Sequence, residues 1–216
     1  MNAIQKRFLN GFKNRWFRCV LAATLLLGGC FGGSLPPENY IRLNAPLAKE
    51  RQEGQALNNG DKVLVAIKQL TCMSGLDRLA VLVAKGPVLQ PSNVWYWEDA
   101  PGNLLSQWLV DILGNSERVK PVWPYGSRVE HDMVLDGRVV LFEIQEDPSS
   151  TFRMKLNLGL WSKNSREMIS NKTFESSAAI DSMNPHGIAR AAEQTALQVE
   201  AEVIDWLEKS IPKKNE

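Results

Sequence analysis

The sequence has few of the residues that enzymes most often use for nucleophilic or metal chemistry. Its 216 residues include only two histidines and three cysteines. The phosphate-binding loop, the His-Glu-x-x-His zinc helix and the Gly-x-Ser-x-Gly nucleophile turn are all absent from it. We therefore expect a protein that is not an enzyme, with no catalytic residue and no metal ligand. Nor is there an internal repeat.

The N-terminal region lacks both acidic residues and an apolar run long enough to cross a bilayer. The run from Val20 to Leu27 has eight residues, whereas a membrane-spanning helix needs about 20. Residues 1–29 contain five basic residues. Basic, then apolar, then small residues is the order typical of a secretory signal. We therefore predict that residues 1–29 are a signal peptide.

The apolar run ends in Leu27-Gly28-Gly29-Cys30. This resembles the bacterial lipobox, in which an aliphatic residue and two small residues precede the cysteine that receives diacylglycerol. The resemblance implies cleavage between Gly29 and Cys30, with a covalent diacylglycerol and an N-acyl lipid on Cys30 and no other cofactor. Residues 31–39 are rich in Gly, Ser and Pro and are predicted to form a tether. Since Phe31 rather than Asp follows the cysteine, we expect the periplasmic face of the outer membrane rather than the inner membrane.

Removing the signal peptide changes the charge and the cysteine content. The whole chain has 25 basic and 24 acidic residues, and without the five basic residues of the signal the balance is 20 to 24. A net negative chain argues against nucleic acid as a partner, because that binding depends on Lys and Arg. Cys19 is lost with the signal and Cys30 is lipidated. Only Cys72 remains, so no intramolecular disulfide is expected.

Hydrophobic periodicity predicts a strand-rich domain between residues 40 and 210, followed by a short tail at 211–216. Strands are predicted at 40–43, 62–67, 79–84, 88–97, 119–123, 133–144, 152–160 and 167–175. Residues 152–160 alternate strictly between apolar and polar, as in a strand with one solvated face. Gly137 is expected to form a bulge. Asn164-Ser165 is expected to make a hairpin turn, and the polar residues 44–61 a loop.

Two helices are expected among these strands. Ala100-Pro101 fits a helix start and Gly114 a stop. Asn184-Pro185 opens a longer helix, whose apolar residues recur every three or four positions. Strands followed by packing helices indicate an α+β fold. We predict a single domain with an antiparallel or mixed sheet and two main helices packed on one face. The expected buried helical residues are Leu104, Leu105, Trp108, Leu109, Ile112, Ile188, Ala192, Thr195, Val199, Val203 and Trp206.

Several short motifs, in this order, resemble the ABC-type transport auxiliary lipoproteins of the paraquat-inducible lipoprotein C type. After the lipobox come Tyr40-Ile41-Arg42-Leu43 and Leu76-Asp77-Arg78, and then Trp97-Glu98-Asp99-Ala100-Pro101. A long hairpin over 133–175 and a C-terminal helix over 185–207 complete the pattern. The resemblance covers nearly all of the chain after the signal. Ala84-Lys85 departs from it, because an Arg or Tyr-Arg often stands there in the family.

The resemblance implies a non-catalytic subunit that accompanies an ABC permease, its ATPase and an MCE-type periplasmic protein in lipid transport between the membranes of a Gram-negative envelope. A homo-oligomer is left open. The candidate partner surface combines two of the family-like motifs with neighbouring aromatic residues. It comprises Leu76, Asp77, Arg78, Trp95, Trp97 and Glu98. The alternative is that Trp97 fills the core and that Asp77 and Arg78 only form a turn.

Two other functions are compatible with the sequence. One is a structural or assembly lipoprotein that acts in the envelope without an ABC system. The other is a periplasmic hydrolase, in which Cys72 would be the nucleophile if His131 or His186 lay beside it in the fold. A lone cysteine is more often a small buried apolar residue, and we expect the two histidines to be surface or capping residues.

Overall fold

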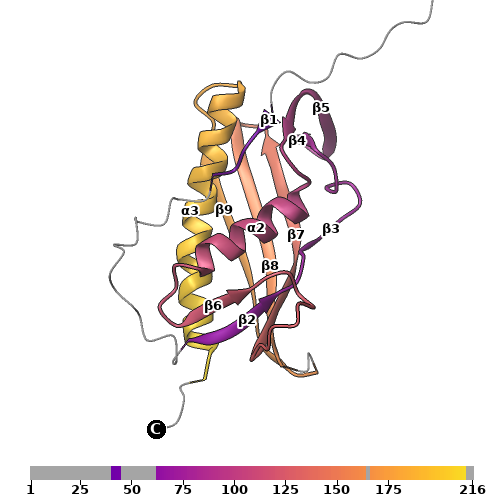
Figure 1. Ribbon diagram of the computed structural model, residues 1–216. Coiled ribbons are helices and arrows are strands. Elements are labelled where there is room, and N and C mark those ends of the chain that lie inside the picture. Colours follow the sequence, from indigo (N-terminus) through magenta and orange to yellow (C-terminus); the bar gives the residue numbers. More distant parts are fainter. Residues whose placement is uncertain (1–39, 45–61, 164–165, 213–216) are drawn as a thin grey trace, which may run out of the picture. The chain divides into compact units, whose positions relative to one another are not determined.

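The computed structural model describes residues 40–44, 62–163 and 166–212 (Figure 1). These belong to one compact unit, Pro37–Glu216. The predicted signal peptide, Cys30 and its tether, nearly all of the predicted loop 44–61, the turn at Asn164-Ser165 and the end of the tail lie outside the described residues.

Within these residues the chain forms nine strands and two helices. In chain order they are β1 (Tyr40–Ile41), β2 (Val63–Ile67), β3 (Thr71–Cys72), β4 (Ala80–Lys85), β5 (Val88–Trp97), α2 (Pro101–Leu113), β6 (Val119–Val122), β7 (Met133–Gln145), β8 (Thr151–Ser162), β9 (Met168–Ala179) and α3 (Pro185–Ser210). The sequence predicted all of them except β3, which has only two residues. The predicted α+β class and mixed sheet are confirmed.

The long strand β7 is the centre of the sheet. Along one of its edges it pairs in parallel with β2, then β3, then β4, which meet its first, middle and last thirds in turn. Its other edge pairs with β8 over nearly its whole length, and β9 follows β8, both antiparallel. Beyond β4 come β5 and β1, and beyond β2 comes β6. Five of the eight described pairings are parallel, so of the two predicted alternatives the sheet is mixed and not antiparallel.

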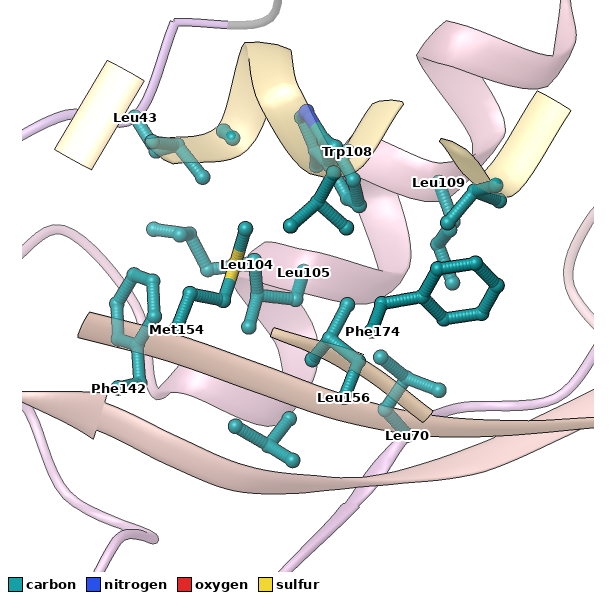
Figure 2. Close-up of a cluster of buried hydrophobic side chains, with 14 of the residues drawn as sticks. Leu43, Leu70, Leu104, Leu105, Trp108, Leu109, Phe142, Met154, Leu156 and Phe174 are labelled. Atoms are coloured by element: carbon teal, nitrogen blue, oxygen red, sulfur yellow. The ribbon is translucent and has the colours of Figure 1, made fainter. Parts of the chain in front are cut away.

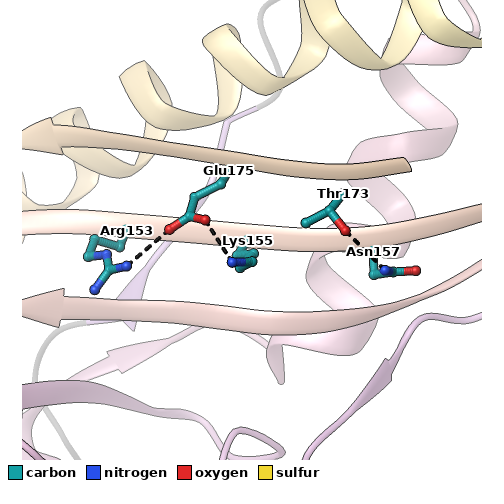
Figure 3. Close-up of polar contacts among 5 residues, drawn as sticks. All are labelled: Arg153, Lys155, Asn157, Thr173 and Glu175. Atoms are coloured by element: carbon teal, nitrogen blue, oxygen red, sulfur yellow. Dashed lines mark hydrogen bonds and ion pairs between the residues drawn. The ribbon is translucent and has the colours of Figure 1, made fainter. Parts of the chain in front are cut away.

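Strand β8 has one apolar side, which faces the core, and one polar side. Its five alternate apolar residues are fully buried. They are Phe152, Met154, Leu156, Leu158 and Leu160. Between them Arg153, Lys155 and Asn157 stay partly exposed on the opposite side. The predicted two-residue alternation is confirmed, and the polar side chains form a cluster with β9 that Figure 3 shows.

The two helices share one core with the apolar side of the sheet. In Figure 1, α3 runs along β9 and α2 lies in front of the strands at its side. All the helical residues that the sequence predicted to be buried are buried, and most belong to this core. Figure 2 shows Leu104, Leu105 and Trp108 of α2 gathered above Met154 and Leu156 of β8.

The ends of α3 follow from its sequence. Asn184 caps the first turn, where its side-chain oxygen accepts a hydrogen bond of 2.9 Å from the Gly187 N–H, and Pro185 takes the first helical position. Ile211, which the sequence placed in the tail, is buried and its N–H donates to the Leu207 carbonyl. The packed domain therefore extends past the predicted boundary. Neither described helix combines the length and the apolar character of a membrane span.

The prediction of a bulge at Gly137 is wrong. Gly137 pairs regularly with Leu158, and the irregularity of β7 lies between Val139 and Leu141 instead. A Cβ atom on residue 137 would overlap the main-chain oxygen of Asn157. Glycine is therefore needed here because two main chains approach closely, which is the other common reason for glycine within a strand.

Candidate binding cleft

A cleft of about 1170 Å³ lies where α2, α3 and the segment after β1 meet. Its lining combines carboxylates and amides with a few apolar side chains. The lining residues are Arg42, Leu43, Asn44, Glu98, Asp99, Asn103, Leu104, Gln107, Trp108, Asp111, Asn115, Glu193 and Leu197. The sequence pointed to only one of them, Glu98, as a candidate binding residue.

Helical periodicity explains how α2 presents two kinds of side chain to the cleft. Residues four apart lie on one helix face, so Asn103, Gln107 and Asp111 form a polar row. Leu104 and Trp108, each one position further along, form an apolar row beside it. The Gln107 amide donates to Asp111 at 3.0 Å and fixes part of the polar row.

Carboxylates dominate the charge of the cleft. Its lining has four of them and a single guanidinium, that of Arg42, whose Nε lies 2.7 Å from a Glu98 oxygen. The hydrogen bonds that the other three carboxylates accept from described residues all come from uncharged groups. Among the described residues none of these three forms an ion pair. They are Asp99, bonded to Asn103 at 3.0 Å, Asp111, bonded to Gln107, and Glu193, bonded to Asn44 at 2.8 Å.

Trp108 has an unusual polar atom in this setting. The residue is only 2% exposed, and its indole N–H has no hydrogen-bond partner in the described part of the chain. In Figure 2 the nitrogen lies at the end of the ring that points away from Leu156 and the sheet. A buried donor without an acceptor costs about 1–3 kcal/mol. Nothing in the sequence marks this donor as unpaired, because the helical pattern only places Trp108 on a buried face.

The structure divides the predicted partner surface into buried and exposed members. Trp97 is 1% exposed, and its ring centroid lies 4.8 Å from that of Phe142 and 5.7 Å from that of Phe152. Leu76 is buried as well. Both belong to the core and not to the predicted surface, because their apolar side chains complete the packing under β4 and β5. The alternative considered for Trp97 is therefore the correct one.

Three of the remaining members of that surface are exposed, whereas Trp95 packs partly buried against the core. Asp77 and Arg78 are exposed in the turn before β4, and Glu98 is exposed after β5. The main-chain N–H of Trp97 donates to the Leu79 carbonyl at 2.7 Å and so holds the end of β5 beside the start of β4. Trp95 is half-buried on β5. These positions leave Asp77, Arg78, Trp95 and Glu98 as the candidate partner surface.

The structure places Cys72 far along β7 from His131. It lies opposite Val139 in β7, whereas His131 precedes Met133, the first residue of β7. Six strand residues span about 20 Å, so this histidine cannot act on the thiol. Burial, followed by the nearby charge of Asp77, raises the pKa of the Cys72 thiol, against a lowering hydrogen bond at the Gly102 main chain. A thiol with a raised pKa is a poor nucleophile at neutral pH.

No group of three or more His, Cys, Asp or Glu side chains that could hold a metal ion occurs in the described ranges. His131 packs against Tyr125, with ring centroids 6.0 Å apart. His186 lies in the first turn of α3. His131 is half-buried and His186 is exposed, and the N-cap of α3 is Asn184.

On the polar side of the sheet two glutamates have pKa values shifted in opposite directions. Glu175 bridges Lys155 at 2.7 Å and Arg153 at 3.0 Å (Figure 3). The hydrogen bond from Lys155, then that from Arg153, lowers the pKa of the Glu175 carboxyl. Glu143 is only 7% exposed. Burial raises the pKa of its carboxyl, and the charge of Arg153 opposes this.

Replacing Glu143 with glutamine is expected to raise the melting temperature at pH 7 and to have no effect below the ordinary pKa of glutamate. Since the Glu143 pKa is raised by folding, the folded state holds more protons than the unfolded state between the two pKa values. Its contribution to stability therefore falls as pH rises through that window. Thermal unfolding of both proteins between pH 3.5 and 8 tests this.

Glu175→Gln is the control for this experiment and should lower the melting temperature at pH 7. Its lowered pKa means that its stabilisation is present at pH 7 and is lost as pH falls through the folded pKa. Because the group is exposed, the loss at pH 7 should be about 0.5 kcal/mol. Equal pH profiles for the two variants would contradict both assignments.

No protein-family profile matches this sequence, and no curated protein matches it. Solved structures with a similar fold exist. A Xanthomonas campestris protein of the DUF330 family has a TM-score of 0.60 at 18% identity, over 72% of this chain and 89% of that one. An uncharacterized protein has a TM-score of 0.58 at 15% identity, over 67% and 92%. A hypothetical protein from Chlamydia trachomatis has a TM-score of 0.50 at 10% identity, over 68% and 98%. At these identities the likeness shows the mixed α+β fold.

Proposed function

We propose that this protein is a lipid-anchored, non-catalytic accessory subunit of an ABC and MCE-type system that moves lipids between the two membranes of a Gram-negative envelope. One observation carries the proposal, namely the sequence Leu27-Gly28-Gly29-Cys30 directly after a basic and an apolar stretch. The family-like motifs at 40–43, 76–78 and 97–101 support it. The proposed location is the periplasmic face of the outer membrane.

The length of the tether supports a role close to the membrane. Residues 31–39 separate the proposed lipid on Cys30 from β1, which begins at Tyr40. Nine residues span at most about 30 Å even when fully extended. A domain held so closely meets only partners that themselves reach the membrane surface, and an MCE-type protein that projects across the periplasm is such a partner.

The test is co-purification of the tagged protein from detergent-solubilised membranes. We expect the permease, the ATPase and the MCE-type protein in the eluate. Exchanging the charges in Asp77→Lys with Arg78→Glu should reduce this recovery roughly tenfold, because complementary charges across an interface become like charges. Both side chains are exposed, so the melting temperature should stay unchanged.

The matched control exchanges another exposed pair, Asp205→Lys with Lys209→Glu on α3, where the two charges lie 2.8 Å apart. This control should leave recovery at the wild-type level. Full recovery with the Asp77 and Arg78 variant would exclude this surface. An eluate of the wild-type protein without any transport subunit would reject the transport proposal and favour an assembly role in the envelope.

A further inference from the structure

We propose that the cleft between α2 and α3 binds a basic, extended peptide segment of a partner protein. This inference does not depend on the lipid anchor or on the transport proposal. It rests on two independent observations on the described residues, namely the excess of carboxylates over cations in the lining and the indole N–H of Trp108, a lining residue, which has no acceptor among them. It also adds a second binding surface to the one at Asp77 and Arg78.

The charge selects a cationic ligand. Asp111 lies on α2, Glu193 lies on α3, and Asp99 shortly precedes α2. Their described hydrogen-bond partners are neutral amides and a main-chain N–H. Within the described lining Arg42 is the single cationic residue, and Glu98 already pairs with it. Lys or Arg side chains entering from solvent would therefore find three carboxylates without a competing cation in the described lining.

The indole N–H selects a ligand that also has an acceptor. A protonated amine has three donors and no acceptor, so a simple polyamine could satisfy the carboxylates but not Trp108. A metal ion likewise offers nothing to an N–H. A basic peptide provides both groups, because its side chains carry the cations and every residue of its main chain carries a carbonyl oxygen.

The size and the apolar part of the cleft also fit a peptide. Its volume of about 1170 Å³ exceeds the roughly 300–1,000 Å³ of most small-molecule pockets. Leu104 of α2 and Leu197 of α3 provide apolar surface between the carboxylates. The aliphatic stem of a lysine or arginine can lie on such surface while its charged end reaches a carboxylate.

The experiment uses the full-length protein in a non-ionic detergent and a fluorescein-labelled ten-residue peptide with four lysines, one leucine and otherwise serine and glycine. Fluorescence polarisation should show saturable binding that weakens with added salt. The same peptide with glutamate in place of lysine should not bind. Asp111→Asn with Glu193→Gln should raise the Kd at least fivefold.

A matched variant, Glu130→Gln with Glu167→Gln, removes the same charge at exposed positions outside the cleft. It should keep the Kd within twofold of the wild type. Trp108→Phe removes the N–H and retains most of the ring. It should raise the Kd by about two- to tenfold, the range of one hydrogen bond. In the described part of the free protein the indole N–H has no partner, so the substitution breaks no described hydrogen bond.

Four results would overturn the proposal. The first is a cleft variant that binds the peptide as tightly as the wild type, and the second is an equal loss in the matched variant. The third is binding of spermine that needs Trp108 and displaces the peptide, which would assign the cleft to a small amine. The fourth is a wild-type protein that binds no peptide. If Lys49→Gln with Arg51→Gln, in the predicted loop 44–61, then restores binding, the carboxylates are occupied by basic residues of the chain itself.

Discussion

Cys30→Ser is expected to move nearly all of the protein out of the membrane fraction, either as a soluble product or as an uncleaved precursor. Each buried methylene of an acyl chain contributes about 0.8 kcal/mol to membrane binding. Two or more chains hold a protein stably, whereas the domain itself has no described helix that could span a membrane. Cell fractionation followed by mass spectrometry of the N-terminal peptide measures the loss directly.

The natural control is Cys72→Ser, since Cys72 is the only cysteine of the described residues and is a partly buried residue of β3. That variant should fractionate like the wild type. A correctly cleaved Cys30→Ser protein that stays at wild-type levels in membranes would contradict the anchoring proposal. Separation of the two membranes tests the sorting prediction at Phe31, and recovery with the inner membrane would contradict that part alone.

Trp97→Ala is expected to lower the free energy of unfolding by about 3–5 kcal/mol, the usual loss when a large buried aromatic side chain is truncated. The ring contacts Phe142 of β7 and Phe152 of β8. Its removal therefore leaves a cavity between the β4–β5 hairpin and the centre of the sheet. Urea unfolding followed by circular dichroism gives the free energy.

Trp123→Ala serves as the comparison, because Trp123 is 36% exposed and follows β6. We expect it to cost less than about 1 kcal/mol, as for most surface substitutions. Similar losses in the two variants would show that Trp97 does not fill the core as described. A Trp97→Ala protein that unfolds like the wild type would return Trp97 to the candidate partner surface.

Local patterns were sufficient to predict most elements of this fold. The alternation in β8 and the start of α3 at Asn184-Pro185 depend on neighbouring residues only, and both are present as predicted. Strand β3 could not be predicted in the same way. It has two residues, and it exists because the chain between β2 and β4 passes along the edge of β7.

Neither the strand order nor the cleft could be predicted from local sequence patterns. The parallel pairing of β2, β3 and β4 with β7 joins segments about 60 or more residues apart, and no local pattern encodes it. The sequence likewise places Trp108 and Asp111 on one helix without indicating that Glu193 of α3 lies across from them. Trp97 shows the remaining difficulty, because an aromatic residue beside charges fits a core and an interface equally well.

The arrangement around β7 has a consequence for the order in which the strands can pair as the chain emerges from its N-terminus. Strands β7, β8 and β9 pair with their neighbours in sequence, so little loop-closure entropy opposes their assembly. In contrast, β2, β3 and β4 emerge first and have no central strand to pair with until β7 follows. The strands of the N-terminal half that pair with β7 therefore wait longer for their partner than those of the C-terminal half, and unpaired strand edges are prone to aggregation.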